Sequence, residues 1–140
     1  MISVPRSSPM NNERLGVLIA QIGSNIDGQT GFWQFDFGEV RLICITDETH
    51  DRMRVMTPIA SVEELSSEHM LASMTANFDR ALDARYCVNN DTLWGAFIHP
   101  LGCLTDALFH SACSQVSEAA VNFGGTYSSG GLSFNSGVVE

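Results

Sequence analysis

The sequence predicts an α+β domain built around an antiparallel sheet. Three segments carry apolar residues at the spacing of three and four that is typical of amphipathic helices, and residues 32–37 alternate apolar and polar side chains, as a half-buried strand does. The elements are expected in the order α-β-β-β-α-β-β-α. A parallel sheet would require strands and helices to alternate, so the helices are expected to flank an antiparallel sheet.

The first half of the chain is expected to form one helix and an antiparallel meander of three strands. The helix covers residues 12–25, with Asn11 or Asn12 as its cap, and the strands cover 32–37, 40–46 and 53–58. Alternation along the first strand places Trp33, Phe35 and Phe37 on one face. Gly38 and Glu39 are short enough a connection for a tight hairpin turn.

The second helix is expected to begin after Ser67, which is its cap. Met70 and Ala81 widen a stripe of larger apolar residues on this helix. That stripe consists of Leu71, Met74, Phe78 and Leu82. A short strand over 84–88 and a turn over 89–91 follow the helix.

The strand over 93–98 is apolar on both faces, with Leu93 and Phe97 on one side and Trp94 and Ile98 on the other. We therefore expect this strand to be covered on both sides. The helix that follows is capped by Thr105 and ends at Gly124, and it is expected to bury one stripe and expose the opposite side. The stripe is Leu104, Leu108, Ala112, Val116, Ala120 and Phe123, and the opposite side is Asp106, His110, Gln115, Glu118 and Asn122.

The length of 140 residues indicates one domain, which we place at residues 12–123. Residues 1–11 are expected to be a flexible arm. Residues 124–140 are rich in glycine and serine and are expected to be disordered or to lie weakly on the surface.

The chain carries 16 acidic and 7 basic residues, all of the basic ones arginine, for a formal net charge of −9. Nucleic acids and anionic membranes bind proteins through clustered positive charge. The composition therefore excludes both as expected partners. No apolar run approaches the roughly 18 residues of a membrane span.

The four cysteines, at positions 44, 87, 103 and 113, do not have the spacing of a disulfide framework. Each lies in an apolar element, where a reduced thiol behaves as a small hydrophobic group. We therefore expect a reducing compartment and a cytoplasmic protein.

Two chemical alternatives start from the region around Pro100. His99, Cys103, His110 and Cys113 fall within fifteen residues and resemble a loose metal-ligand set, but they lack the paired spacing of zinc sites. Core cysteines and surface histidines are the favoured interpretation. Cys103 with His99 could form a nucleophile pair, yet the sequence offers no orienting acid, so we expect no enzyme, no metal and no cofactor.

Several segments resemble a known family. They are Trp33-x-Phe35, residues 51–55 leading to Pro58, Asn77-Phe78, Leu93-Trp94, and residues 98–101. Together with the element order, the small size and the acidic pI, they resemble the type III secretion chaperone fold, and in particular its YbjN-like branch of bacterial sensory-transduction regulators. The resemblance covers about residues 12–123. It implies a homodimer that binds an extended or partly unfolded peptide, without cofactor or catalysis.

From the sequence we therefore expect a peptide-binding chaperone or regulatory adaptor that acts as a homodimer. A sheet that is apolar on both faces needs more cover than two helices supply, so a second copy is the expected cover. The expected dimer interface is Met70, Leu71, Met74 and Phe78, and the expected peptide-binding residues are Trp33, Phe35, Phe37, Arg41, Arg52 and Arg54. The arginines would either orient carboxylates of the peptide or be solvated rim charges. The alternative function is a structural self-association module with no client.

Overall fold

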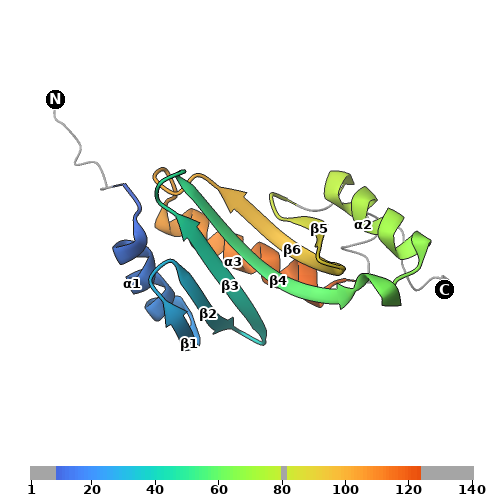
Figure 1. The fold of residues 1–140 in the computed structure, drawn as a ribbon, viewed down its shortest axis with the longest axis horizontal. Helices are drawn as coiled ribbons and strands as arrows, with labels where there is room; N and C mark the ends of the chain where they lie inside the picture. The colour runs from blue at the N-terminus through green and yellow to red at the C-terminus, as the bar shows by residue number, and fades with distance from the viewer. Residues whose placement is uncertain (1–8, 80–81, 124–140) are drawn as a thin grey trace.

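The computed structural model describes residues 9–79 and 82–123 of the chain (Figure 1). The helices are α1 (Asn12–Ile22), α2 (Ser67–Asp79) and α3 (Asp106–Val121), and a 3-10 turn, η1 (Val62–Glu64), precedes α2. The strands are β1 (Ser24–Gln29), β2 (Phe32–Phe37), β3 (Val40–Asp47), β4 (Arg52–Ser61), β5 (Arg85–Asn89) and β6 (Thr92–His99). The expected tail over 124–140 lies outside the described residues, as do residues 1–8 of the expected arm.

The strands form one sheet in the order β1-β2-β3-β4-β6-β5, and every pair of neighbours is antiparallel. The predicted fold class, α+β with an antiparallel sheet, is therefore confirmed. The predicted element order lacks one strand. That strand is β1, which pairs with β2 at the edge of the sheet.

The first helix ends at Ile22 rather than at residue 25, because the chain turns into β1 at Gly23. A Cβ atom at Gly23 would lie 2.6 Å from Cδ2 of Phe35, so only glycine lets the backbone pass this close to the core. Asn25 then adopts a positive φ of 49°, and the register of β1 shifts between Ser24 and Asp27. The sequence of this irregular edge strand does not alternate apolar and polar side chains, so it does not predict a strand.

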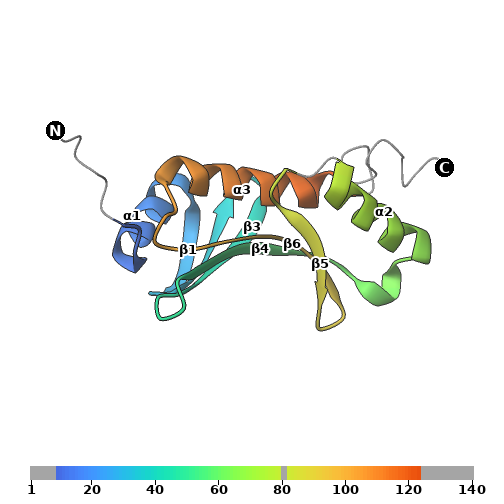
Figure 2. The ribbon, with the colours of Figure 1, turned by 90° about the horizontal axis from the view of Figure 1, so that it is seen from above.

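Helices α1 and α3 lie on the same side of the sheet, as Figure 2 shows. Helix α3 packs across β2, β3, β4 and β6, and α1 contributes Leu15, Leu18 and Ile19 to the same core. The fully buried side chains of this core include Leu15, Ile19, Phe35, Leu42, Met53, Val55, Phe109 and Val116. Burying one such side chain contributes roughly 1.5–3 kcal/mol to folding, so this single layer between helices and sheet is the main source of stability.

Among the described residues, helices cover one face of strand β6. Leu93, Gly95 and Phe97 are buried against the helices, whereas Ile98 on the other face is 53% exposed. The expected cover on both sides of this strand is therefore not supplied by residues 9–79 and 82–123. Leu93 and Phe97 do lie on one face and Ile98 on the other, as predicted, but no element of the described chain covers the second face.

The last helix begins as predicted, since the Thr105 side chain accepts a hydrogen bond from the backbone N–H of Leu108 at 3.0 Å. Its buried face shares Ala112 and Val116 with the predicted stripe but also includes residues outside that stripe. The buried residues are Phe109, Ala112, Cys113, Gln115, Val116 and Ala119. Gln115 was expected on the exposed side, but its Oε1 atom accepts hydrogen bonds from the backbone N–H groups of Asp83, at 2.8 Å, and Ala84, at 2.9 Å.

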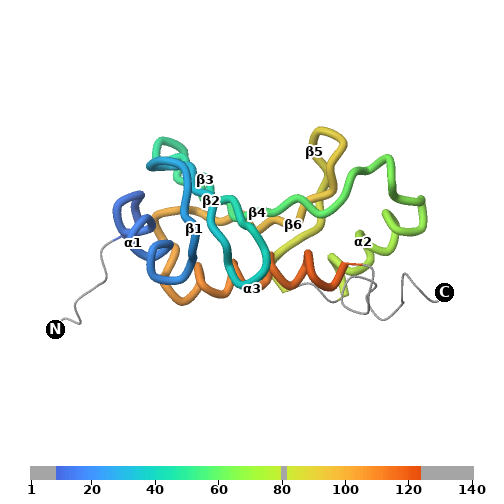
Figure 3. Tube along the Cα trace, turned by 90° about the horizontal axis from the view of Figure 1, so that it is seen from below, coloured from blue at the N-terminus to red at the C-terminus, as the bar shows by residue number. Residues whose placement is uncertain are grey.

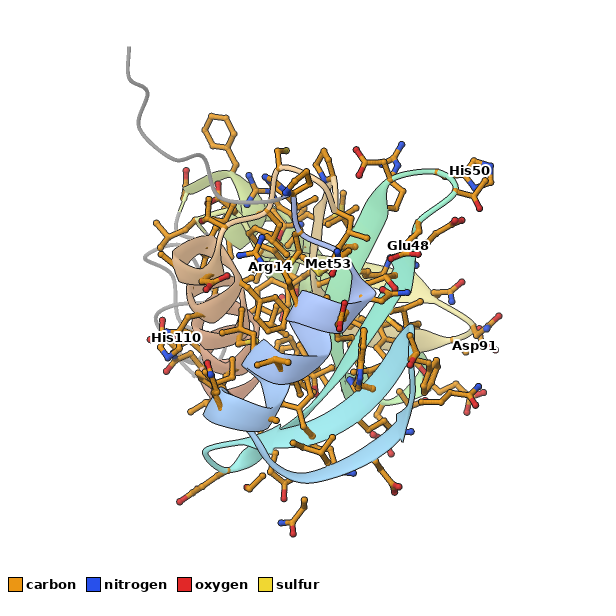
Figure 4. All side chains as sticks on the ribbon, turned by 90° about the vertical axis from the view of Figure 1, so that its left-hand side faces the viewer. Arg14, Glu48, His50, Met53, Asp91 and His110 are labelled. Carbon is orange, nitrogen blue, oxygen red and sulfur yellow. The ribbon has the colours of Figure 1, made fainter. Side chains whose placement is uncertain are left out.

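The start of the described chain is anchored rather than loose. Met10 is buried, and its N–H donates to the carbonyl oxygen of Gly102 at 3.1 Å, which departs from the arm expected over 1–11. Asn11 caps α1 by accepting from the N–H of Arg14 at 2.9 Å. In Figure 4, Glu48 of the β3–β4 turn lies beside the start of α1, where it accepts from the N–H of Asn12 at 3.0 Å.

Candidate protein-binding surfaces

The face of the sheet opposite α1 and α3 is called the open face here, and it is turned toward the viewer in Figure 1. Strand register assigns its side chains, because residues directly opposite each other on neighbouring strands point to the same side. Its central residues are Ile43, Ile45, Arg52, Arg54, Met56, Trp94, Ala96 and Ile98. The centre of the open face is thus apolar, with two arginines set into it.

The open face is hollowed at two adjoining places. One hollow of about 460 Å³ is lined by Ile45, Thr46, Asp47, Arg52, Met53, Arg54 and Ile98. A second, of about 310 Å³, is lined by Arg54, Met56, Cys87, Asn89, Trp94, Ala96 and Ile98. Because both contain Arg54 and Ile98, they form one continuous trough. Figures 2 and 3 show the β3–β4 turn and the β5–β6 turn projecting on this side at the two ends of the trough.

Arginine is concentrated on this face. Four of the seven arginines of the chain carry side chains on it by register, namely Arg41, Arg52, Arg54 and Arg85. Arg52 and Arg54 are exposed, and among the described residues neither makes a hydrogen bond or an ion pair. Asp47 is the one acidic residue lining the trough, and its Oδ2 lies 2.8 Å from Nδ1 of His50. Two arginine charges therefore remain available to a ligand.

Arg41 has a different role from its two neighbours. Its Nη1 atom donates to Oδ1 of Asp36 and to the carbonyl oxygen of Asn25, both at 2.9 Å, while the Asn25 side chain donates to Oδ2 of Asp36 at 2.7 Å. The bonds from Asn25 and Arg41 lower the pKa of Asp36 below its ordinary value of 3.8. Arg41 thus fastens the irregular strand β1 to β2 and β3.

The expected peptide-binding residues do not share one surface. Trp33 and Phe35 are buried in the core, and Phe35 is 0% exposed, because they face α1 and α3. Phe37 is half-buried on the same side, where its ring meets that of His110 with a centroid distance of 5.5 Å. The three arginines lie on the opposite, open face. The sequence identified the alternation of β2, but not which face the helices would take.

The expected dimer residues do lie together. On α2 the side chains of Leu71 and Met74 are each 67% exposed, Phe78 is 91% exposed, and Leu82 just beyond the helix is 65% exposed. These four residues are called the α2 stripe. Met70 is half-buried at its border. An apolar row of this length that the described part of the chain leaves uncovered is typical of an interaction surface.

The inner side of α2 explains why the stripe points outward. This side is small and polar, with Ser73 and Ala76 buried. The Asn77 side chain donates to the carbonyl oxygen of Tyr86 at 2.9 Å and accepts from its N–H at 2.7 Å. Figure 1 shows α2 beside β5 at the far end of the sheet from α1. The helix is therefore held by hydrogen bonds to an edge strand rather than by its larger apolar residues.

The cysteines and histidines near Pro100 form no metal site: within residues 9–79 and 82–123, no three His, Cys, Asp or Glu side chains are grouped so as to hold an ion. Burial raises the pKa of the Cys113 thiol to about 12 and also raises that of Cys44. Cys87 and Cys103 are exposed, which corrects the expectation that each cysteine is a core residue. In Figure 4, His110 on α3 lies far from His50 on the β3–β4 turn.

No helix in the described part of the chain is both long enough and apolar enough to cross a membrane.

The chain was compared with known proteins. No protein-family model matches it, and no curated protein sequence matches it. Solved structures with a chain of similar fold include two complexes. For "Structure of the HopA1-SchA Chaperone-Effector Complex" the TM-score is 0.56 at 8% identity, covering 79% of this chain and 95% of the other. For "Crystal Structure of the ExsC-ExsE Complex" the TM-score is 0.57 at 14% identity, covering 78% and 90%. The expected type III secretion chaperone-like fold is confirmed, while the YbjN-like branch stays a prediction.

Proposed function

We propose that this chain is a non-enzymatic homodimer that binds a client protein, as a chaperone or as a regulatory adaptor. The observation that carries the proposal is that residues 9–79 and 82–123 leave two separate apolar surfaces uncovered, the α2 stripe and the open face. Soluble chains rarely expose contiguous apolar patches unless a partner binds there. One surface serves the second copy and the other serves the client.

The α2 stripe is suited to a second copy of the chain. In a two-fold dimer the same patch from each copy meets itself, so the patch must be self-complementary. Leu71, Met74 and Phe78 are uncharged and lie on one side of one helix, and apolar rows of this kind meet each other without opposing like charges. Phe78, at 91% exposure, gains most from such burial.

The open face is suited to the client. Its trough is long and shallow and combines aliphatic walls with the indole ring of Trp94, whose Nε1 atom donates to the carbonyl oxygen of Asn89 at 3.2 Å. A surface of this kind accommodates an extended chain rather than a compact small molecule, which needs an enclosed cavity. The Met56 thioether adds a flexible wall that adapts to different apolar side chains.

The fold likeness to a chain of a chaperone–effector complex supports the chaperone form of the proposal. The sequence resemblance to YbjN-like sensory-transduction regulators supports the adaptor form. Both forms place the protein in the cytoplasm, and both use the same two surfaces.

The test is a capture experiment in lysate of the source cells. Tagged wild-type chain, the open-face variant Ile98→Asp and the control variant Val17→Asp are compared, because Ile98 and Val17 are similarly exposed at 53% and 56%. Captured chains are identified by mass spectrometry, purified, and titrated against each variant by calorimetry.

We expect one or a few polypeptides that bind wild type and Val17→Asp and fail to bind Ile98→Asp. Recovery of the tagged chain alone would favour a self-association module with no client and would overturn the client-binding part of the proposal.

A further inference from the structure

We propose that the client segment recognised by the open face is an extended acidic peptide, with two carboxylates at alternate positions followed by an apolar side chain at the next alternate position. This inference rests on the proposed function and specifies the client. It is carried by the order of side chains that β4 presents to the trough.

Strand β4 presents Arg52, Arg54 and Met56 to the open face in succession. Alternate residues of a strand are about 6.6–6.8 Å apart on the same face. An extended peptide has the same repeat, so a peptide that runs along β4 places alternate side chains over these three residues. Carboxylates match the two guanidinium groups, and an apolar side chain matches the thioether.

The walls beside β4 strengthen this selection. Arg54 lies directly opposite Ile98 on β6, and on its other side it lies opposite Ile45 on β3. The guanidinium is therefore bordered by apolar groups that exclude water when a ligand covers them. An ion pair formed there is screened less than one at an open surface.

The charge of the whole chain does not prevent this binding. The net charge of −9 repels an acidic ligand at long range, but the Debye length in physiological salt is about 8 Å. The lining of the trough itself contains Arg52, Arg54 and one acidic residue, Asp47, which lies opposite Arg52 in the register and 2.8 Å from the His50 ring. At physiological salt the charges that line the trough therefore affect binding of the peptide more than the net charge of the chain does.

The probe is a fluorescein-labelled peptide of eleven residues that contains Asp-Ser-Asp-Ser-Leu in a Gly/Ser background. Two analogues replace both Asp residues by Asn or by Lys. Fluorescence anisotropy in about 0.15 M salt measures Kd for each peptide. We expect the Asp peptide to bind and the Asn peptide to bind roughly tenfold more weakly, since two partly exposed ion pairs contribute at most a few-fold each. We expect the Lys peptide to be weaker still.

Variants of the chain assign the effect to the two arginines. Arg54→Gln is expected to weaken binding of the Asp peptide about two- to five-fold and to leave binding of the Asn peptide unchanged. Arg14→Gln is the matched control, because it removes the same charge from α1 (Figure 4), where Arg14 pairs with Asp106 at 3.2 Å. The double variant Arg52→Glu/Arg54→Glu is expected to prefer the Lys peptide over the Asp peptide.

Equal Kd values for the Asp and Asn peptides, no binding of the Asp peptide, or an Asp preference that survives in the double variant would each overturn the inference. None of these results would affect the capture experiment. If a client is captured through Ile98 but the peptides show no charge preference, the proposed function stands and only the acidic specificity is lost. Circular dichroism of each variant establishes that the fold is retained.

Discussion

Asn77 on α2 and Tyr86 on β5 are joined by two hydrogen bonds, one in each direction. The amide of Asn77 thereby takes the place of a neighbouring strand at the outer edge of β5, which pairs with β6 on its other side. Edge strands of sheets are sites of unwanted pairing, and a side chain that satisfies the edge reduces that tendency. The same two bonds position α2 so that its stripe points away from the chain.

Asn77→Ala is expected to destabilise the fold by about 1–3 kcal/mol, because it leaves a backbone N–H and a carbonyl of Tyr86 without their partner. Urea unfolding followed by circular dichroism measures the loss. Thr75→Ala is the control on the same helix, since the exposed Thr75 hydroxyl donates only to the carbonyl of Leu71, and its cost should stay within about 0.5 kcal/mol. Equal effects of the two substitutions would contradict the role given to Asn77.

Gln115→Ala should also cost about 1–3 kcal/mol, because the Gln115 side chain satisfies two backbone N–H groups in the segment that leads into β5. The comparison is Gln21→Ala on the exposed side of α1. The urea midpoints of the two variants measure the difference in their stability. A Gln115→Ala chain as stable as wild type would show that water replaces the side chain without loss.

Met74→Glu should convert a dimer into a monomer. Each copy would bring a carboxylate into an apolar contact at a cost of about 1 kcal/mol or more, so association should weaken at least tenfold. Sedimentation equilibrium measures the change. Val17→Glu, on α1 and similarly exposed, is the control that should leave association intact. Identical association constants for wild type and Met74→Glu would remove the α2 stripe from the interface.

Acid should loosen the edge of the sheet through Asp36. Its pKa is lower in the folded chain than its ordinary value of 3.8, so its contribution to stability is complete well above pH 3.8 and is lost as the pH falls through and below that value. Urea midpoints from pH 7 to pH 3 should therefore fall more for wild type than for Asp36→Asn. Parallel curves would show that the bonds from Asn25 and Arg41 do not stabilise the folded state.

The four thiols should divide into two classes. Cys87 and Cys103 are exposed and should react with a thiol reagent in the native protein, whereas Cys44 and Cys113 are buried and out of its reach. Burial raises the pKa of Cys44 and Cys113, and partial burial also raises that of Cys87, so Cys87 should react slowly. Reaction requires the thiolate. A thiol-reagent assay should count two reactive groups in buffer and four in urea. Four rapidly reacting thiols in buffer would contradict the burial of Cys44 and Cys113.

Strong periodicity in the sequence predicted most of the helices and strands. The predictions that failed did so for physical reasons. The helix beginning after Thr105 and the strand carrying Trp33 were found because packing against one face imposes a period on the sequence. Strand β1 was missed because it is exposed along its whole length, so no face constrains its residues. Gln115 was predicted on the exposed side of its helix, because the sequence does not distinguish a buried amide that has hydrogen-bond partners from an exposed one.

Of the two candidate sites, the sequence predicted the residues of one as a set and combined residues from two faces in the other. The α2 stripe was predicted as a set because its residues share a helical period, and the structure places them on one side. The peptide-binding set combined Phe35 with Arg54, although the two lie on opposite faces of the sheet. Alternation tells which side chains share a face of one strand. It does not tell which of the two faces a distant helix will cover.

Hydroxyl-radical footprinting of the protein, with and without the client chain that capture identifies, tests the central claim most directly. Met56 and Trp94 report on the open face, and Met74 reports on the α2 stripe. We predict that the client protects Met56 and Trp94 from oxidation, and that Met74 is protected with and without client at concentrations where the dimer forms. Full reactivity of Met56 and Trp94 in the presence of bound client would contradict it.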